Sequence, residues 1–149
     1  MTEPKIIHGG LSIDDRGWLS FVNDFDFSRV KRFYQVENHS QDTIRAFHGH
    51  LVEEKYVYVA SGDVMVLLVK LDKVEKPDKK AKIEKYILSA KSPSILHIPA
   101  GYANGFKSLS KHTKVIFFST KSLTDSVQND DYRYAYDYWG KEIWEITNR

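Results

Sequence analysis

The sequence predicts a single all-β domain of the sandwich or barrel type. Short runs rich in β-branched and aromatic residues recur along the chain, at 31–36, 55–60, 64–71, 83–88, 94–98 and 113–119. Turn-forming residues separate these runs, as in Asp14-Asp15-Arg16-Gly17 and Pro99-Ala100-Gly101. The apolar residues show little helical periodicity. Short strands separated by turn signals in this way are typical of antiparallel sandwiches and barrels.

The remaining segments fit the same scheme in chain order. Residues 45–50 are expected to form another strand, and the lysine-rich stretch at 70–85 is expected to be a solvated connection between two strands, because acidic residues alternate with its lysines. Pro99 and Gly101 form a turn between the buried strand residues Ile98 and Phe106. Only 124–138 is ambiguous, although the tyrosines at 132, 134, 136 and 138 alternate as they would in a strand.

Length and composition narrow the class of protein. The 149 residues are enough for one domain with a core, so 1–149 is expected to be one domain. The chain has no cysteine, which excludes disulfides, thiolate metal sites and cysteine nucleophiles. Its 22 basic and 20 acidic residues are too evenly balanced for general nucleic-acid binding. No run approaches the ~20 apolar residues of a membrane span, and the start does not resemble a signal peptide, so we expect a cytoplasmic protein without membrane contact.

Two histidines stand two residues apart in the expected strand Arg45-Ala46-Phe47-His48-Gly49-His50. Side chains at i and i+2 leave the same face of a strand, so both imidazoles can reach one cavity. A pair of this kind suits either proton transfer or metal binding.

A metal-binding interpretation lacks one ligand. His48, His50 and Glu54 match the first half of a cupin metal signature, but Asn104 stands where the third histidine is expected. An amide oxygen is a poor ligand for Zn, Fe or Cu, although two histidines and a carboxylate are still able to hold a metal. We therefore predict no metal and rank a metal-dependent enzyme last.

Several motifs follow one another in a fixed order: Asp15-Arg16-Gly17, Gln35 to Ser40, Arg45 to His48, Lys55, Ile98 to Phe106, and finally Tyr136-Asp137 with Ile143-Trp144. In this order they resemble the RmlC-like cupins, which are sugar-nucleotide 3,5-epimerases of 4-keto-6-deoxy sugars, and the related 3,4-ketoisomerases. The resemblance implies a cupin jelly roll that needs no cofactor. It also implies a nucleotide-sugar substrate, with dTDP as the expected nucleotide, and usually a homodimer.

The resemblance assigns roles to individual residues. His48 is the expected base, which removes a proton from the carbon next to a ketone. Lys55 and Arg45 are expected to hold the enolate oxygen or the diphosphate. The complete prediction comprises catalytic His48, His50 and Lys55, and substrate-binding Arg16, Gln35, Asn38, Arg45 and Asn104, with Arg16 reaching a neighbouring subunit.

Two departures from the family pattern affect the return of the proton. Phe117 stands where epimerases place a tyrosine, and the aspartate that pairs with the base in longer epimerases has no counterpart before the chain ends at Arg149. Tyr34, Tyr56, Tyr58 and Tyr102 are candidates for the missing acid, although packing explains each of them. His-x-His with four residues between His50 and Lys55 resembles the ketoisomerases instead.

The first hypothesis is thus an epimerase acting at C3 and/or C5 of a nucleotide-linked 4-keto-6-deoxy sugar, in deoxysugar and surface polysaccharide biosynthesis. The alternatives are a 3,4-ketoisomerase acting on the same class of substrate and a sugar-nucleotide-binding cupin without catalytic activity.

Overall fold

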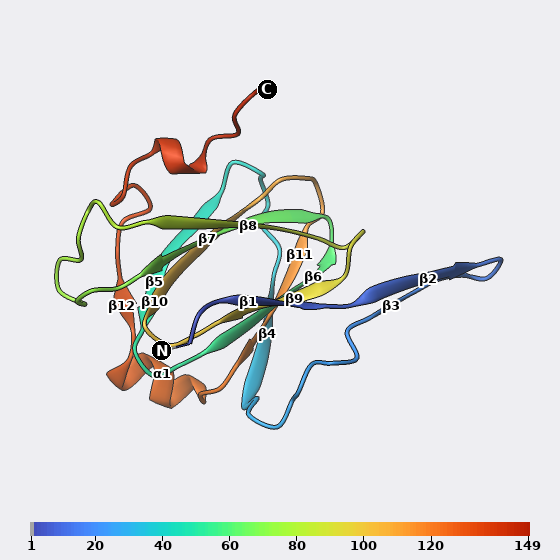
Figure 1. The fold of residues 1–149 in the computed structure, drawn as a ribbon, viewed down its shortest axis with the longest axis horizontal. Coiled ribbons are helices and arrows are strands. Elements are labelled where there is room, and N and C mark those ends of the chain that lie inside the picture. Colours follow the sequence, from blue (N-terminus) through green and yellow to red (C-terminus); the bar gives the residue numbers. More distant parts are fainter. Residues whose placement is uncertain (1) are drawn as a thin grey trace.

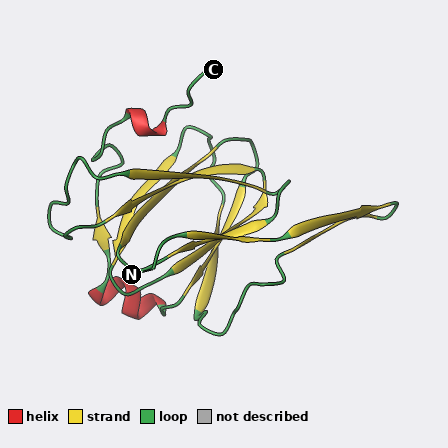
Figure 2. Ribbon diagram, viewed as in Figure 1, coloured by secondary structure: helices red, strands yellow, loops and turns green. Residues whose placement is uncertain are grey.

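Two five-stranded antiparallel sheets face each other in the computed structural model, which describes residues 2–149 (Figure 1; Figure 2). The first sheet has the strand order β1-β9-β6-β11-β4, and the second has the order β12-β5-β10-β7-β8. Strands β2 and β3 form a separate hairpin. The prediction of an all-β sandwich or barrel is therefore confirmed.

The elements are short, as the turn signals predicted. Their bounds are β1 (Lys5–His8), β2 (Gly10–Asp14), β3 (Gly17–Phe21), β4 (Arg32–Val36), β5 (Ile44–His50), β6 (Lys55–Ser61), β7 (Asp63–Lys70), β8 (Ile83–Ser89), β9 (Ser94–Ile98), β10 (Tyr102–Ser108), β11 (Lys114–Ser119), α1 (Leu123–Asn129), β12 (Tyr132–Arg133) and a 3-10 turn at Glu142–Trp144. The six expected runs correspond to β4, β6, β7, β8, β9 and β11.

Strand β7 shows how the core is built. Its apolar run is buried from Val64 to Val69, so side chains on both of its faces are excluded from water. Val66 and Leu68 cluster with Val57 and Leu96 of the first sheet, and this cluster fills the space between the two sheets. Because β7 is covered on both faces, its sequence is continuously apolar instead of alternating.

The C-terminal segment covers the outer face of the second sheet. Trp139 and Trp144 pack there against Phe47, Met65 and other buried residues. Each indole N–H donates a hydrogen bond to a backbone carbonyl, Trp139 to Asp78 at 2.9 Å and Trp144 to Tyr136 at 2.8 Å. The large rings thus bury apolar area without leaving a polar atom unpaired.

The ambiguous stretch at 124–138 is mainly not a strand. Residues Leu123–Asn129 form α1, whose N-cap Ser122 accepts a hydrogen bond from the Asp125 amide at 3.2 Å. Only Tyr132–Arg133 pairs with β5 as strand β12. The Ser122 cap favours a helix over a strand at 123–129, because the serine side chain accepts a hydrogen bond from an amide that a helix start leaves free.

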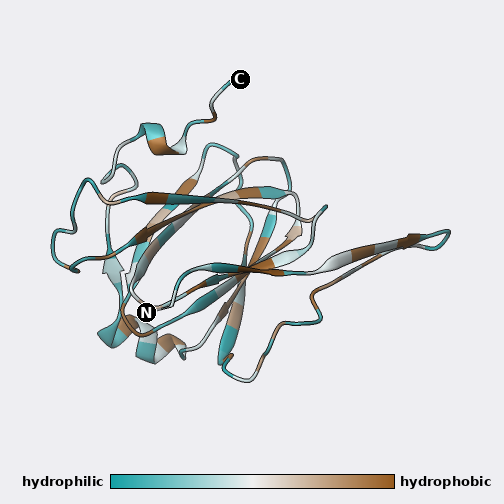
Figure 3. Cartoon of the chain, in the orientation of Figure 1, coloured by the Kyte–Doolittle hydropathy of each residue, from teal (hydrophilic) through white to brown (hydrophobic). Residues whose placement is uncertain are grey.

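The β2–β3 hairpin projects from the sandwich as an arm (Figure 1). Hydrophobic residues recur along this arm (Figure 3). Several of its large side chains stay exposed, with Trp18 at 75% and Ile13 at 71% of their full exposure. The lysine-rich stretch forms the connection between β7 and β8, as predicted. No helix within residues 2–149 has the length and apolar character of a membrane span.

Candidate active site

A cavity of about 440 Å³ lies between the two sheets at the end where α1 is found. Strands β4, β6 and β11 of the first sheet, strands β5, β10 and β12 of the second, and α1 contribute to its wall. Five of the eight predicted site residues line it, namely Arg45, His48, His50, Lys55 and Asn104. The predicted shared face of His48 and His50 is thus confirmed.

His48 lies in the middle of this wall. Its strand β5 pairs with β10 on one side and β12 on the other, which places His48 opposite Asn104 and Arg133. The Asn104 side-chain amide donates a hydrogen bond to the His48 carbonyl at 3.1 Å, so it braces the backbone of this residue. Burial and then the positive charge of Lys55 hold the pKa of His48 below its ordinary value of 6.5. The imidazole is therefore neutral near pH 7, the state that a base requires.

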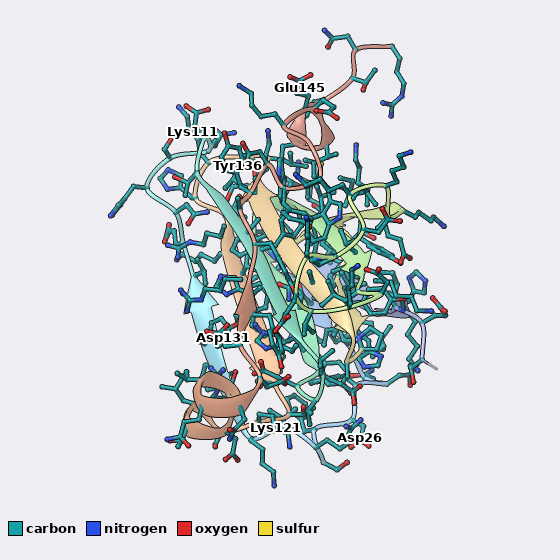
Figure 4. All side chains as sticks on the ribbon, turned by 90° about the vertical axis from the view of Figure 1, so that its left-hand side faces the viewer. Asp26, Lys111, Lys121, Asp131, Tyr136 and Glu145 are labelled. Carbon is teal, nitrogen blue, oxygen red and sulfur yellow. The ribbon has the colours of Figure 1, made fainter. Side chains whose placement is uncertain are left out.

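A carboxylate accompanies His48. Oδ1 of Asp131 lies 3.8 Å from Nδ1 of His48, and Arg133 Nε donates to the other carboxylate oxygen at 3.2 Å. Figure 4 shows Asp131 directly beyond α1. The expectation that the base has no aspartate partner is therefore wrong. The sequence holds only a weak signal for this residue, the acidic pair Asp130-Asp131 before the tyrosine-rich stretch.

His50 is more deeply enclosed, with 5% of its surface exposed. Its Nδ1 lies 2.5 Å from the Asp130 carbonyl oxygen and 3.1 Å from Glu53 Oε2. Its Nε2 is buried and has no hydrogen-bond partner within residues 2–149. Burial and then Lys55 lower the pKa of His50 as well.

Glu53 is a site residue that the sequence analysis missed. It is 2% exposed and accepts hydrogen bonds from the hydroxyls of Ser119 at 2.5 Å and Ser126 at 3.0 Å. Arg32 lies 3.3 Å from the same carboxylate. Burial alone raises the pKa of Glu53, but the Ser119 hydroxyl and the charge of Lys55 outweigh it, so the pKa is lowered and the carboxylate is ionised.

Glu54, which the metal signature pointed to, does not join the histidine pair. Its carboxylate contacts His97 Nε2 at 2.6 Å and Arg29 at 2.6 Å. His97 in turn stacks on Tyr56, and neither residue lines the cavity. Successive residues in extended chain point to opposite faces, which is why Glu53 turns inward and Glu54 does not.

Lys55 and two stacked rings form the wall opposite His48. The Lys55 Nζ lies 5.8 Å from the ring centre of Tyr34 and 5.9 Å from that of Phe117. The two rings are 5.1 Å apart and nearly parallel, because the register of β4 and β11 pairs Tyr34 with Phe117. Tyr34 is the one member of the four candidate tyrosines that lines this cavity.

Arg45 connects this cavity to a neighbouring one. Its Nε donates to Asn38 Oδ1 at 2.6 Å. Asn38 lines a second and larger cavity of about 680 Å³, together with residues of the β4–β5 and β10–β11 connections such as Lys111. The pair therefore stands between two hollows, and in Figure 4 Lys111 lies at the end of the sandwich opposite α1.

Two predicted residues are not part of the site within this chain. Gln35 is exposed on β4, between Tyr34 and Val36, which line the cavity, so it points to the opposite face. Arg16 lies at the turn of the hairpin arm, where its Nη2 forms an ion pair with Asp14 at 2.6 Å. Neither side chain lines the cavity that holds His48.

Comparison with curated proteins and solved structures gives a consistent result. The chain is 26% identical over 126 residues to the spore coat polysaccharide biosynthesis protein SpsL of Bacillus subtilis, covering 83% of this chain and 82% of SpsL. The dTDP-4-dehydrorhamnose 3,5-epimerase of Bacillus anthracis, solved with TDP and PPi bound, is similar with a TM-score of 0.76 and 22% identity over 98% of this chain and 87% of that one. The TDP-quinovose 3,4-ketoisomerase WlaRB of Campylobacter jejuni is similar with a TM-score of 0.65 and 21% identity, covering 93% and 98%.

These likenesses confirm the predicted jelly roll of RmlC-like cupins as the fold. The family model described as dTDP-4-dehydrorhamnose 3,5-epimerase matches residues 3–145, which is nearly the whole chain. The chain belongs to the dTDP-4-dehydrorhamnose 3,5-epimerase family.

Proposed function

We propose that this protein is an epimerase that inverts C3 and/or C5 of a dTDP-linked 4-keto-6-deoxy sugar. The observation that carries the proposal is the placement of His48 and Tyr34 in one cavity on strands of different sheets, β5 and β4. Inversion requires a base on one face of the sugar ring and an acid on the other. Two groups on facing walls meet this requirement.

The reaction proceeds in two proton transfers. His48 removes the proton from the carbon next to the ketone, and the electrons of that C–H bond move to the ketone oxygen to form an enolate. The Lys55 ammonium stabilises this oxyanion by charge. The Tyr34 hydroxyl then gives its proton to the same carbon from the opposite face as the ketone forms again. The phenolate recovers a proton from solvent, and the His48 imidazolium releases its proton to solvent. Asp131 stabilises the imidazolium form of His48 in the intermediate state.

We assign to Tyr34 the role of the tyrosine that epimerases of the family place at the position of Phe117. The two residues are direct cross-strand neighbours with stacked rings, so the Tyr34 side chain belongs to the same part of the cavity wall as Phe117. Arg45 and Asn38 are proposed to contact the diphosphate and nucleoside, because they lie between the active-site cavity and the larger polar one.

A 3,4-ketoisomerase is the second candidate, favoured by the presence of His50 beside His48 in the same cavity. That reaction moves hydrogen between adjacent carbons, so a single base on one face is sufficient. A sugar-nucleotide-binding protein without activity is the third candidate. Either enzyme would act in deoxysugar and surface polysaccharide biosynthesis, in line with the name of the relative SpsL.

Incubation with dTDP-4-keto-6-deoxyglucose in deuterated water, followed by NMR, distinguishes these candidates. An epimerase incorporates deuterium at C3 or C5 and forms a product with inverted configuration. A 3-keto product would identify the ketoisomerase. The absence of both deuterium incorporation and a new product would favour the binding protein without activity.

His48→Asn is expected to lose about 10²- to 10⁴-fold in rate, the usual contribution of a general base.

The Tyr34→Phe variant tests the second proton transfer separately. His48 still removes the proton in this variant, so deuterium enters the sugar, but without Tyr34 it returns from the original face and no inverted product forms. Tyr56→Phe is the matched control, because Tyr56 stacks on His97 outside the cavity and is expected to leave both exchange and inversion unchanged. Inversion at the wild-type rate in Tyr34→Phe would contradict the assignment.

We further propose that the protein is a homodimer in which the hairpin arm lies against the second copy. The exposed Trp18, Ile13 and Leu19 on this arm support the proposal, since such apolar area is usually covered by a partner. Arg16 at the turn of the arm would then reach the partner's cavity. Light scattering is expected to give a dimer for the wild type and a monomer for Trp18→Ser, while Ile146→Ser, at a similarly exposed position away from the arm, stays dimeric.

A cytoplasmic location stays a prediction, to be tested by cell fractionation.

A further inference from the structure

We infer that His50 is a hydrogen-bond acceptor for a hydroxyl group of the hexose, held in one tautomer by Asp130 and Glu53. This inference rests on the proposed function, because it names a contact between the same cavity and its sugar. The His50 ring is 5% exposed and lines the cavity, so it is an enclosed part of the wall.

The surroundings of Nδ1 decide the tautomer. A backbone carbonyl only accepts hydrogen bonds, and the Asp130 carbonyl oxygen lies 2.5 Å from Nδ1. The ionised Glu53 carboxylate, 3.1 Å from the same nitrogen, is also only an acceptor. Nδ1 therefore carries the hydrogen. In a neutral imidazole this leaves Nε2 with a lone pair and no hydrogen.

Nε2 is the atom that lacks a partner. It is buried, and no donor within residues 2–149 reaches it. A buried acceptor without a donor is costly, and such atoms are rare unless a ligand or water completes them. Since Nδ1 is held on the side of Asp130 and Glu53, Nε2 is the ring nitrogen left for a ligand in the cavity. A hexose presents hydroxyl groups, which are the donors that this nitrogen requires.

The charges around the ring keep it neutral in the free protein. Lys55 on β6 and the neighbouring His48 on β5 line the same cavity as His50, while Glu53 and Asp130 lie on the side of Nδ1. Burial and Lys55 together outweigh the two carboxylates, so the pKa of His50 is below its ordinary value of 6.5. A neutral ring with its hydrogen on Nδ1 has no proton to give from Nε2. His50 is therefore not the group that returns the proton, which agrees with the role given to Tyr34.

Glu53 is the positioning residue of this arrangement. The hydroxyls of Ser119 on β11 and Ser126 on α1 fix its carboxylate, and Arg32 on β4 balances its charge. The Asp130 side chain fixes the same corner, since it accepts the backbone N–H groups of residues 51–53 at 2.6 to 3.2 Å. The ring of His50 thus meets the sugar in a defined orientation.

Imidazole ¹⁵N NMR of the substrate-free protein tests the tautomer directly, because protonated and bare ring nitrogens have well separated shifts. Near neutral pH we expect His50 to be neutral with its hydrogen on Nδ1. In Glu53→Gln the carboxylate that opposes burial is gone, so His50 is expected to titrate at lower pH than in the wild type. Glu54→Gln breaks a similar carboxylate–histidine pair, Glu54 with His97 at 2.6 Å outside the cavity, and is expected to leave the His50 signals unchanged. A hydrogen on Nε2, or a charged ring near neutral pH, would overturn the inference.

Steady-state kinetics test the contact with the sugar. In His50→Phe the loss of one hydrogen bond to bound substrate and transition state alike is expected to raise KM about tenfold and to leave kcat within about threefold. His50→Gln keeps an acceptor oxygen and is expected to recover part of the KM effect. A drop in kcat of about 10²-fold or more at unchanged KM would instead make His50 an acid or base and refute the inference.

The two measurements separate this inference from the proposed function. If no deuterium enters dTDP-4-keto-6-deoxyglucose, the proposed epimerase fails, while the NMR spectrum of the free protein still decides the tautomer. If the His50→Phe variant does not fold, the NMR spectra of the wild type and of Glu53→Gln still decide the tautomer of His50.

Discussion

Replacing Asp131 by asparagine removes the charge next to the proposed base while keeping the shape of the side chain. At 3.8 Å, two opposite unit charges attract by about 4 kcal/mol at an effective dielectric constant of 20 and by about 1 kcal/mol in bulk water. The His48 side chain is 39% exposed, and Arg133 shares the Asp131 carboxylate, so the attraction lies near the lower of these two energies. We therefore expect Asp131→Asn to lose about 1 to 1.5 kcal/mol of transition-state stabilisation, which lowers kcat/KM about five- to tenfold.

The pH dependence of kcat/KM has a defined sign in this experiment. The proposed base His48 is active in its neutral form, so the rate is expected to fall as the pH falls through the pKa of His48, which lies below 6.5. Asp131 raises this pKa, whereas burial, Lys55 and Arg133 lower it. In Asp131→Asn the acid limb of the profile is therefore expected to move to lower pH while the plateau drops.

The assay is the rate of epimerisation of dTDP-4-keto-6-deoxyglucose at constant ionic strength, together with an NMR titration of His48. Asp125→Asn is the control, because Asp125 is an exposed acid on α1 whose removal changes the net charge equally. If the acid limb of Asp131→Asn stayed in place or moved to higher pH, the pairing of Asp131 with His48 would be refuted.

Three further predictions concern stability. Leu68→Ala, at a fully buried position between the sheets, is expected to lower the free energy of unfolding in urea by about 2–5 kcal/mol, and a loss below about 1 kcal/mol would contradict the packing described. Gly62→Ala is expected to lower it by at least about 1 kcal/mol, because Gly62 has a φ of 79° and an added Cβ would lie 2.3 Å from Thr113 Oγ1. The lowered pKa of Glu53 contributes stability that is complete above the ordinary value of 4.5 and is lost as the pH falls through the lowered pKa. The melting temperature of the wild type is therefore expected to fall more steeply below pH 4.5 than that of Glu53→Gln, and equal slopes would count against the buried network.

Patterns among neighbouring residues were sufficient to predict most of the strands and the pair of histidines in the cavity. Alternation, turn residues and β-branched runs predicted the strands, because these signals act over neighbouring residues. The i, i+2 spacing placed His48 and His50 on one face, and the structure brings both to one cavity. The helix at 123–129 was missed because its length is only two turns, too short for a periodic apolar pattern to show.

The partners of the two histidines depend instead on long-range contacts. Asp131 reaches His48 only because α1 returns the chain to the edge of β5, and Glu53 reaches His50 only because Ser119 and Ser126 hold it inward. Neither arrangement leaves a pattern in neighbouring residues, so the sequence predicted no aspartate for the proposed base and did not point to Glu53, while Glu54 drew notice only as part of the incomplete metal signature.

The sequence by itself determined the all-β class, the family and the two imidazoles, since each depends on residue types at short and regular spacings. The tertiary structure alone decided that Gln35 faces away from the cavity and that Tyr34 lies beside Phe117. These two residues are neighbours in space through the pairing of β4 with β11, although more than half of the chain separates them. Strand register sets which face each residue presents, and a register between distant strands is fixed by packing of the whole sandwich.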